Sequence, residues 1–255
     1  MRRREKFVVS SISLSVGLFG VLQVPLDLRY LAVAAFMLLT YGVATWALAD
    51  DLQTHERVTV VPFPALYAGA VSLFYFLLPT HFLSQVAVLS LFGVGMYALF
   101  LTANIWSVAK GRTIQLIHAA HAVGLLFTLL TSLLLTNTIF SLRLNVLFSV
   151  LLVALAHGLL IFMSLWSVQL ENRIEKRIVG LTGLMTLVVC EVALTMSFFP
   201  FSVWYRALFV MSILYIGLGI LQNYLRGRLF SRTLTEYSLV AFFVVLIFIF
   251  IFPYK

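Results

Sequence analysis

The sequence has a single cysteine and few charged side chains. Cys190 stands alone among 255 residues, and one thiol can form neither an intrachain disulfide nor a thiolate zinc cluster. Charged residues make up only 10% of the chain, and neither a P-loop nor a glycine-rich dinucleotide-binding pattern is present. The polar segments between the apolar runs are too short to fold around a nucleotide. These absences exclude a disulfide scaffold and the common nucleotide-dependent soluble enzymes.

Hydrophobic residues, by contrast, make up 62% of the chain, well above the fraction in water-soluble domains. They form runs of about 20 residues, the length at which an α-helix crosses the hydrocarbon core of a bilayer. The sequence therefore predicts an all-α, polytopic transmembrane helix bundle, with residues 1–255 forming a single transmembrane domain. About nine spans are expected, at residues 7–24, 30–49, 58–79, 86–108, 115–136, 144–168, 178–199, 207–225 and 238–252.

Three of the four tryptophans, Trp46, Trp106 and Trp166, are separated by 60 residues each. Their surroundings, ATWALADD, NIWSVAKG and SLWSVQLE, are alike, because each lies near the end of an apolar run that a polar loop follows. A fixed period of this kind indicates an internal repeat. We interpret the repeat unit as a pair of membrane helices, with a fourth copy marked by Arg226. One leading helix would then be followed by four tandem helical hairpins.

Lysine and arginine fall mainly in alternate loops. Of the 17 basic residues, all but four lie on one side of the predicted topology, the exceptions being Arg29, Arg143, Arg206 and Lys255. Because basic loops are retained in the cytoplasm during insertion, we expect a multi-pass protein of the plasma (inner) membrane with a cytoplasmic amino terminus and an outside carboxyl terminus. The net charge of +8 then reflects this bias and predicts attraction to anionic lipid headgroups, not binding of nucleic acid.

Polar side chains inside the spans recur at helical spacing. His118, His121 and Ser132 share one face of the fifth span, and Ser149 and His157 share one face of the sixth. Polar groups in lipid usually face a bundle interior or a cavity. The alternative interpretation is that they are contacts between packed helices. The residues that we expect to line a polar cavity or proton relay are Asn104, His118, His121, His157, Glu191 and Gln222.

Glu191 is the most costly residue of the chain in a bilayer, because an acid at the centre of a spanning helix costs roughly 2.5–3.5 kcal/mol. It must be protonated or paired. His118 and His121 are three residues apart, which lets two imidazoles meet one ion, and His157 with Glu191 would complete a tetrahedral metal site. The His-Glu-x-x-His signature of metalloproteases is absent, and the sequence identifies no cofactor.

The charged loops and the third span give three further expectations. The charges of two cytoplasmic loops, which include Asp50 and Glu56, are interpreted as solvated faces. Pro62 and Pro64 each remove a backbone donor and should bend the third span, as in helices that line transport paths. The polar residues on the outer side are too sparse and scattered to predict a catalytic centre there; they are Asp27, Arg29, His81, Arg143 and Arg206.

The segment ALFVMSILYIGLGILQNYLRGRLFSRTLTEYSLV, residues 207–240, resembles small uncharacterised bacterial multi-pass membrane proteins grouped as a domain of unknown function. The resemblance covers roughly the last two hairpins. It implies a bacterial plasma membrane location and transfers no catalytic or binding residue.

The sequence favours a non-enzymatic integral membrane protein, transporter-like or scaffolding, whose polar stripes meet in an inward-facing cavity. The second hypothesis is an intramembrane enzyme that depends on a metal or haem bound by His118, His121, His157 and Glu191. A third is an accessory subunit that packs against a protein partner in a larger membrane complex. The lipid bilayer is the expected surrounding in all three cases.

Overall fold

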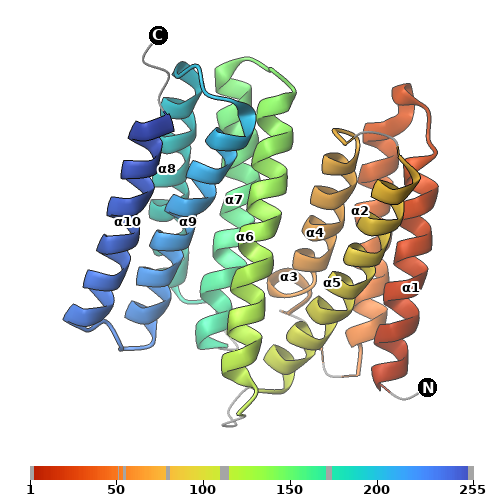
Figure 1. Cartoon of the computed structure of the whole chain (residues 1–255). Coiled ribbons are helices and arrows are strands. Elements are labelled where there is room, and N and C mark those ends of the chain that lie inside the picture. Colours follow the sequence, from red (N-terminus) through yellow and green to blue (C-terminus); the bar gives the residue numbers. More distant parts are fainter. Residues whose placement is uncertain are drawn as a thin grey trace. The chain divides into compact units, whose positions relative to one another are not determined.

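The computed structural model of the chain describes residues 3–50, 52–53, 56–78, 81–109, 115–170 and 174–251. Helices joined by short turns account for this part of the chain, which contains no strand, and the predicted all-α class is confirmed. The elements are α1 (Arg3–Leu22), η1 (Leu26–Leu28), α2 (Arg29–Leu48), α3 (Glu56–Thr59), α4 (Pro62–Tyr75), α5 (Phe82–Val108), α6 (Ile117–Ser141), α7 (Val146–Gln169), α8 (Lys176–Phe198), α9 (Val203–Leu225) and α10 (Ser231–Ile251) (Figure 1).

Nine helical segments in the described part of the chain are long and apolar enough to cross a membrane, the number that the apolar runs predicted. The short helix α3 and helix α4 together form one of them. Large apolar side chains such as Leu38, Leu91 and Leu147 are largely exposed on the helix surfaces. Such exposure is unfavourable in water, at about 25 cal/mol per Å² of apolar surface, and carries no penalty in lipid. The fold is compatible with an integral, multi-pass membrane protein.

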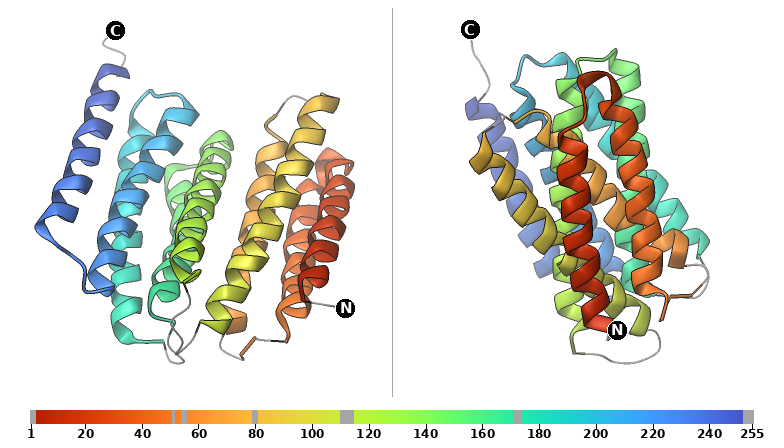
Figure 2. Two further views of the ribbon diagram at one scale, coloured as in Figure 1. Left: turned by 60° about the horizontal axis from the view of Figure 1, so that its bottom comes forward. Right: turned by 90° about the vertical axis from the view of Figure 1, so that its right-hand side faces the viewer.

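The chain divides into two compact units, Met1–Phe127 and Thr128–Lys255, and the division falls inside α6. In the first unit α2 packs against α4, and α1 packs against α2 and α5 (Figures 1 and 2). Aromatic rings fill the space between these helices. The ring of Tyr67 stacks on Phe92 with 5.6 Å between centroids, and Phe127 meets Tyr67 edge-on at 5.3 Å. Both are favourable geometries for aromatic pairs.

The third span is interrupted, as its prolines predicted. Helix α3 ends at Thr59, and α4 begins at Pro62. Proline suits the first turn of a helix, where an N–H group would have no intrahelical partner, and disrupts a helix interior. The break leaves no backbone donor unpaired, because the N–H groups of Val60 and Val61 donate to the carbonyl of Glu56 at 2.8 and 3.3 Å. The bend therefore costs few hydrogen bonds.

Glu56 is buried, which corrects the interpretation of its loop as a solvated face. Its side chain is 0% exposed, and its carboxylate accepts the backbone N–H of Gln53 at 2.7 Å. A glutamate that reaches back three residues in this way closes the start of a helix. The sequence did not reveal this role, because a charged loop residue has the same pattern whether it points to water or folds back on the chain.

In the second unit α7 packs against α8 and α9, and α9 packs against α8 and α10 (Figure 2). Helix α7 starts where the side chain of Asn145 accepts a first-turn N–H at 3.1 Å, and it stops where Leu170 adopts the left-handed conformation with φ 52°. Phe248 of α10 packs on α9, with its ring centroid 4.6 Å from that of Phe209. Local caps thus determine where α7 begins and ends, and side-chain packing determines which helices lie next to each other.

An ion pair between Lys6 and Asp50 connects α1 to the segment after α2. The Nζ of Lys6 lies 2.7 and 3.0 Å from the two carboxylate oxygens of Asp50 and 6.0 Å from the ring centre of Trp46. Trp46 is 52% exposed, whereas Trp106 and Trp166 are 2% and 0% exposed. The three spaced tryptophans therefore have unlike surroundings, and the 60-residue repeat stays a prediction.

Asp50 should make the stability of the first unit depend on pH at the acid end. The hydrogen bond from Lys6 lowers the pKa of the Asp50 carboxyl below its ordinary value of 3.8. Stabilisation from a lowered pKa is fully present above 3.8 and is lost as the pH falls below it. We expect Asp50→Asn to lower the melting temperature in detergent at neutral pH and to flatten its fall in acid. Asp27→Asn, at an exposed position, is the control, and parallel curves for all three proteins would contradict this expectation.

Gly95→Ala should destabilise the first unit. A Cβ at Gly95 would contact the Tyr67 hydroxyl and lie 2.9 Å from Cε1 of Phe127, so both rings would have to shift. Overpacking of this kind costs about 1–3 kcal/mol, measurable as unfolding free energy in mixed micelles. Gly42→Ala is the matched control on α2, because a Cβ there meets nothing within 4 Å and alanine favours the helix. Equal stability of the two variants would show that α5 has room at Gly95.

Candidate functional site

A buried hydrogen-bonded cluster joins α6 and α7 in the second unit. The Nε2 of His157 lies 2.8 Å from Oγ of Ser132 and 3.3 Å from Oγ1 of Thr136. Its Nδ1 lies 3.0 Å from the carbonyl oxygen of Val153, one turn earlier on α7. The side chains of His157, Ser132 and Thr136 are all fully buried. Two of the predicted polar stripes therefore do meet, through these three residues.

The partners of His157 determine where its proton lies. A backbone carbonyl can only accept, so Nδ1 carries the hydrogen and donates it to Val153. In the neutral ring Nε2 is then an acceptor, and the hydroxyls of Ser132 and Thr136 can donate to it. A metal ion would need the same lone pair on Nε2. The arrangement fits a neutral imidazole that holds two helices together.

Gln222 forms a second contact between helices in this unit. Its Nε2 donates to Oγ of Ser164 at 2.9 Å, which connects α9 to α7. Ser164 also accepts the hydroxyl of Ser167 on its carbonyl oxygen at 2.8 Å. Gln222 and Ser164 are both buried. Their polar groups are used in helix packing, the alternative that the stripe pattern left open.

Sequence reasoning missed Thr136 as a partner of His157. The available signal was its position four residues after Ser132, which places both hydroxyls on one face of α6. The neighbouring Thr131 and Asn137 are also buried, and Oγ1 of the first and Nδ2 of the second have no hydrogen-bond partner among the described residues. This part of α6 is therefore more polar than the fifth span was predicted to be.

The remaining candidates are spread over both units. The first unit contains Asn104, half-buried on α5, and two residues at the start of α6, His118, which is exposed, and His121, which is half-buried. The second unit contains His157, Glu191 and Gln222. A single cavity or proton relay lined by all six residues stays a prediction.

No three histidine, cysteine, aspartate or glutamate side chains in the described ranges come together in a way that could hold a metal ion. His118 and His121 belong to the first unit, and His157 belongs to the second with both ring nitrogens in hydrogen bonds. The metal set of His118, His121 and His157 stays a prediction that no contact supports.

Glu191 lies on an exposed face of α8. Its backbone carbonyl accepts the hydroxyl of Thr195 at 2.8 Å, while no described hydrogen bond or ion pair involves its carboxyl group. The neighbouring Cys190 is half-buried. The acid that we expected to face a cavity is therefore presented on the surface of its helix.

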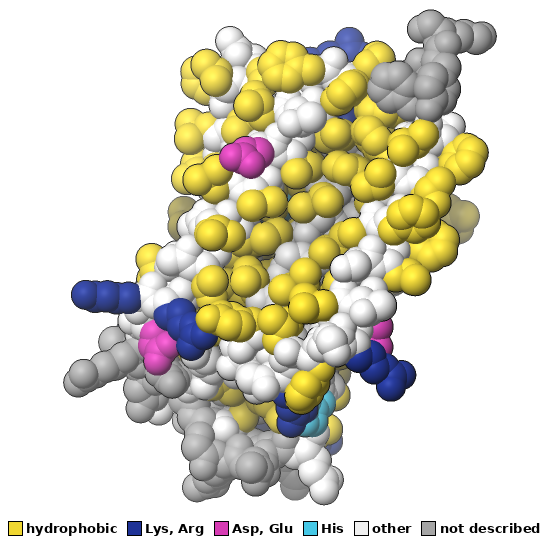
Figure 3. All heavy atoms as spheres, turned by 90° about the vertical axis from the view of Figure 1, so that its left-hand side faces the viewer, with side chains coloured by type: hydrophobic (Ala, Val, Ile, Leu, Met, Phe, Trp, Pro, Cys, Tyr) yellow, Lys and Arg dark blue, Asp and Glu magenta, His cyan; other side chains and the backbone are white. Residues whose placement is uncertain are grey.

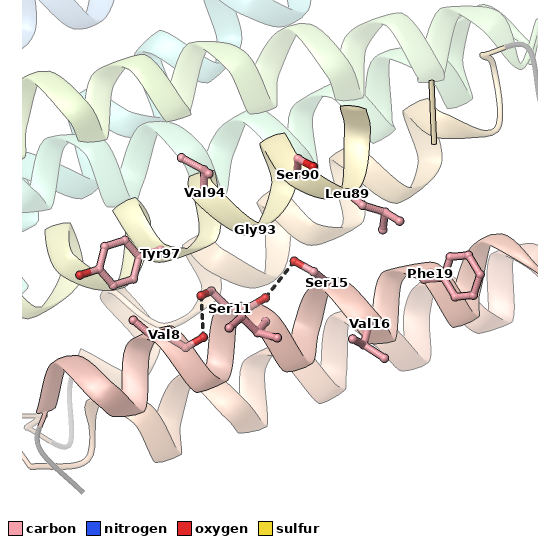
Figure 4. A pocket seen from close by; sticks show the side chains of 11 residues that line it. Val8, Ser11, Ser15, Val16, Phe19, Leu89, Ser90, Gly93, Val94 and Tyr97 are labelled. Atoms are coloured by element: carbon pink, nitrogen blue, oxygen red, sulfur yellow. Dashed lines mark hydrogen bonds between the residues drawn. The ribbon is translucent and has the colours of Figure 1, made fainter. Parts of the chain in front are cut away.

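A groove with a volume of about 670 Å³ runs between α1 and α5 in the first unit (Figure 4). It is lined mainly by apolar side chains, with Val8, Val16 and Val94 among them. Two of its three serines bond within their own helix: Ser11 donates to the carbonyl of Val8 and Ser15 to that of Ser11, each at 2.9 Å. The groove is suited to apolar chains and contains none of the predicted site residues.

Removing both hydroxyls beside His157 should cost more than the sum of removing each. In Ser132→Ala the Thr136 hydroxyl can still donate to Nε2, and the reverse holds in Thr136→Val. We expect losses of about 1 kcal/mol or less for each single variant and about 2–3 kcal/mol for the double variant, which leaves a buried acceptor unpaired. The measurement is the free energy of unfolding in mixed micelles.

The control for this experiment is Thr138→Val. Thr138 lies on the same helix and donates only to the carbonyl of Leu134 at 2.9 Å, so its removal should leave the interaction energy of the other two unchanged. Strictly additive losses from Ser132 and Thr136 would show that the two hydroxyls do not share His157.

No curated protein and no solved structure matches the chain. One family does match, over residues 9–251, and it is described as a protein of unknown function (DUF5656). The match covers all nine apolar helices almost completely. The chain therefore belongs to the DUF5656 family.

Proposed function

We propose that the protein is a non-enzymatic membrane scaffold, an accessory subunit whose helix α8 docks against a transmembrane helix of a partner protein. The observation that carries this proposal is the exposed carboxyl group of Glu191 within an apolar span. The proposal includes the plasma membrane location and the cytoplasmic amino terminus that the basic loops favour.

The position of Glu191 makes its exposure costly. It lies seven residues before the end of α8 at Phe198, about 10 Å along the helix axis at 1.5 Å per residue. A hydrocarbon core about 30 Å thick therefore contains it. An acid facing lipid alone would cost roughly 2.5–3.5 kcal/mol, and a hydrogen-bond donor on an adjacent helix would offset this cost.

The surface around Glu191 suits a helix. Leu184, Leu187 and Phe198 are exposed at positions that share its face of α8. Nearer the start of α8, a Cβ added at Gly180 or Gly183 would meet nothing within 4 Å, so the backbone is open to close approach there. Figure 3 shows the molecule from the left-hand side of Figure 1, where hydrophobic side chains cover a broad area and an acidic side chain lies among them.

The carboxyl group of Glu191 indicates which kind of partner helix would bind. A transmembrane helix with an arginine or lysine at the depth of Glu191 would pair with it and lower the cost of both groups in lipid. Scaffolding is favoured over transport because His157 and Gln222, which were expected to line a cavity, use their polar groups to join helices. The protein would thus contribute a surface to a complex, while its buried polar residues stabilise its own fold.

The test uses a synthetic transmembrane peptide of leucines with one arginine at the depth of Glu191, and a second peptide with leucine in that place. Energy transfer between labelled protein and labelled peptide in lipid vesicles measures their association. We expect about three- to twentyfold tighter association of the arginine peptide, because polar contacts between membrane helices contribute roughly 0.6–1.7 kcal/mol. Glu191→Leu should remove this preference.

Glu175→Gln is the matched control, because it changes an acid at the N-cap of the same helix. It should leave the preference unchanged. Equal binding of the two peptides to the native protein, or an unaltered preference in Glu191→Leu, would overturn the proposal. Energy transfer between two labelled copies that is lost in Glu191→Leu would instead identify the occupant of this face as a second copy of the chain.

A further inference from the structure

A basic pocket lies at one end of the second unit, where α6 and α8 end and α7 and α9 begin. It has a volume of about 380 Å³, within the range of small-molecule sites. The residues that give it chemical character are Arg143, Arg206, Ser149 and Ser197, and Phe140 forms part of its wall. None of the residues that line it is acidic. The two positive charges are therefore not neutralised within the pocket.

The guanidinium of Arg206 is positioned by a ring contact and has N–H donors left for a ligand. Its guanidinium lies over the ring of Phe140, 5.4 Å from the centroid, so one face is covered by a cation–π contact. Its Nε is buried and has no hydrogen-bond partner among the described residues. A guanidinium fixed by its face still presents the N–H groups along its edge, which match the oxygens of a phosphate group. Arg206 therefore has the geometry of an anion-binding residue, and none of the described residues that line the pocket supplies the anion.

Arg143 enters the pocket from the turn after α6. This residue has a φ of 49°, in the left-handed region that non-glycine residues rarely occupy. The turn it makes is closed by its N–H, which donates to the carbonyl of Phe140 at 3.4 Å. Arg143 and Phe140 thus belong to the same turn, and the ring of Phe140 contacts the guanidinium of Arg206. The same short segment places both cations in one pocket.

The rest of the pocket adds to the attraction for an anion. Ser149 lies near the start of α7, whose N-terminal end carries the positive pole of the helix dipole. Ser197 donates its hydroxyl proton to the carbonyl of Ala193 at 2.8 Å, so it lines the pocket without offering a donor, and the hydroxyl that can donate to an anion is that of Ser149. Two guanidinium groups, a hydroxyl and a helix N-terminus together favour an anion with several oxygens.

The first unit contains a related but weaker arrangement. A pocket of about 170 Å³ is lined by Arg29, Gln23 and Gln85, and Arg29 lies 4.6 Å from the ring centroid of Phe76. Its Nε is also buried without a hydrogen-bond partner in the described part of the chain. The stacked arginine is common to both pockets, while the second cation and the larger volume occur only in the second unit.

We propose that the pocket of Arg143 and Arg206 binds a phosphate group. A phosphate offers oxygens to two arginines at once, and the pocket lies at the end of spanning helices, where phospholipid headgroups are found. The headgroup of an anionic phospholipid and free phosphate share this chemistry. The site is separate from the docking face of α8, because Glu191, Leu184, Leu187 and Phe198 are not among the residues that line it.

The test measures binding of phosphatidylglycerol and, separately, of inorganic phosphate to the full-length protein by native mass spectrometry from detergent. Arg143→Asn removes one charge with a residue that tolerates a positive φ, and Arg206→Lys keeps the charge but loses the two-pronged donor edge. We expect each variant to weaken binding about tenfold, as for the loss of a hydrogen bond to a charged group. Unchanged melting temperatures establish that the variants fold.

Arg177→Gln is the matched control, because Arg177 makes a cation–π contact of 4.6 Å with Tyr224 at the opposite end of the same unit. It should bind like the native protein. Loss of phosphatidylglycerol binding in the two pocket variants would support the proposal with a lipid as the ligand, and loss of inorganic phosphate binding alone would support it with free phosphate. Native binding of both ligands in the pocket variants, or an equal loss in Arg177→Gln, would overturn it.

Discussion

The interior of a bilayer offers no hydrogen-bond partners, and the structure follows from this constraint. Hydroxyl side chains within the spans donate to carbonyls one turn earlier, as Thr40 does to Phe36 and Ser72 to Ala68, at 2.8 and 2.6 Å. His157 meets the same requirement with hydroxyls from α6 and a carbonyl of its own helix. Polar residues can therefore be numerous inside this protein without forming a passage through it.

Some polar groups escape such pairing, and two of them lie on an exposed helix face and at a helix end. Glu191 presents its carboxyl group on the exposed face of α8, and the nitrogen Nε of Arg206 lies unpaired beside a pocket. An ionisable or polar group without a partner costs free energy in an apolar surrounding. The places of Glu191 and Arg206 favour functions that involve partners and lipids over chemistry in the core.

The helical class, the number of spans and the break at Pro62 could be predicted because they depend on local properties. The length of an apolar run sets whether it can span, and proline acts on its own helix. The polar stripes that contain Ser132 and His157 followed from helical spacing, whereas the contact between these two residues came from the structure. Thr136 and the burial of Glu56 did not follow, because each depends on which neighbour folds against it.

The sequence by itself determined that the chain is helical, apolar and rich in polar stripes, since composition and period are written along the chain. Only the tertiary structure decided which stripe is covered. Glu191 was expected to face a cavity because an acid is costly in lipid, and yet it is exposed, since the cost of a residue does not tell what lies opposite its face. Arg143 and Arg206 are 63 residues apart and looked unrelated, and the packing of helix ends places them in one pocket.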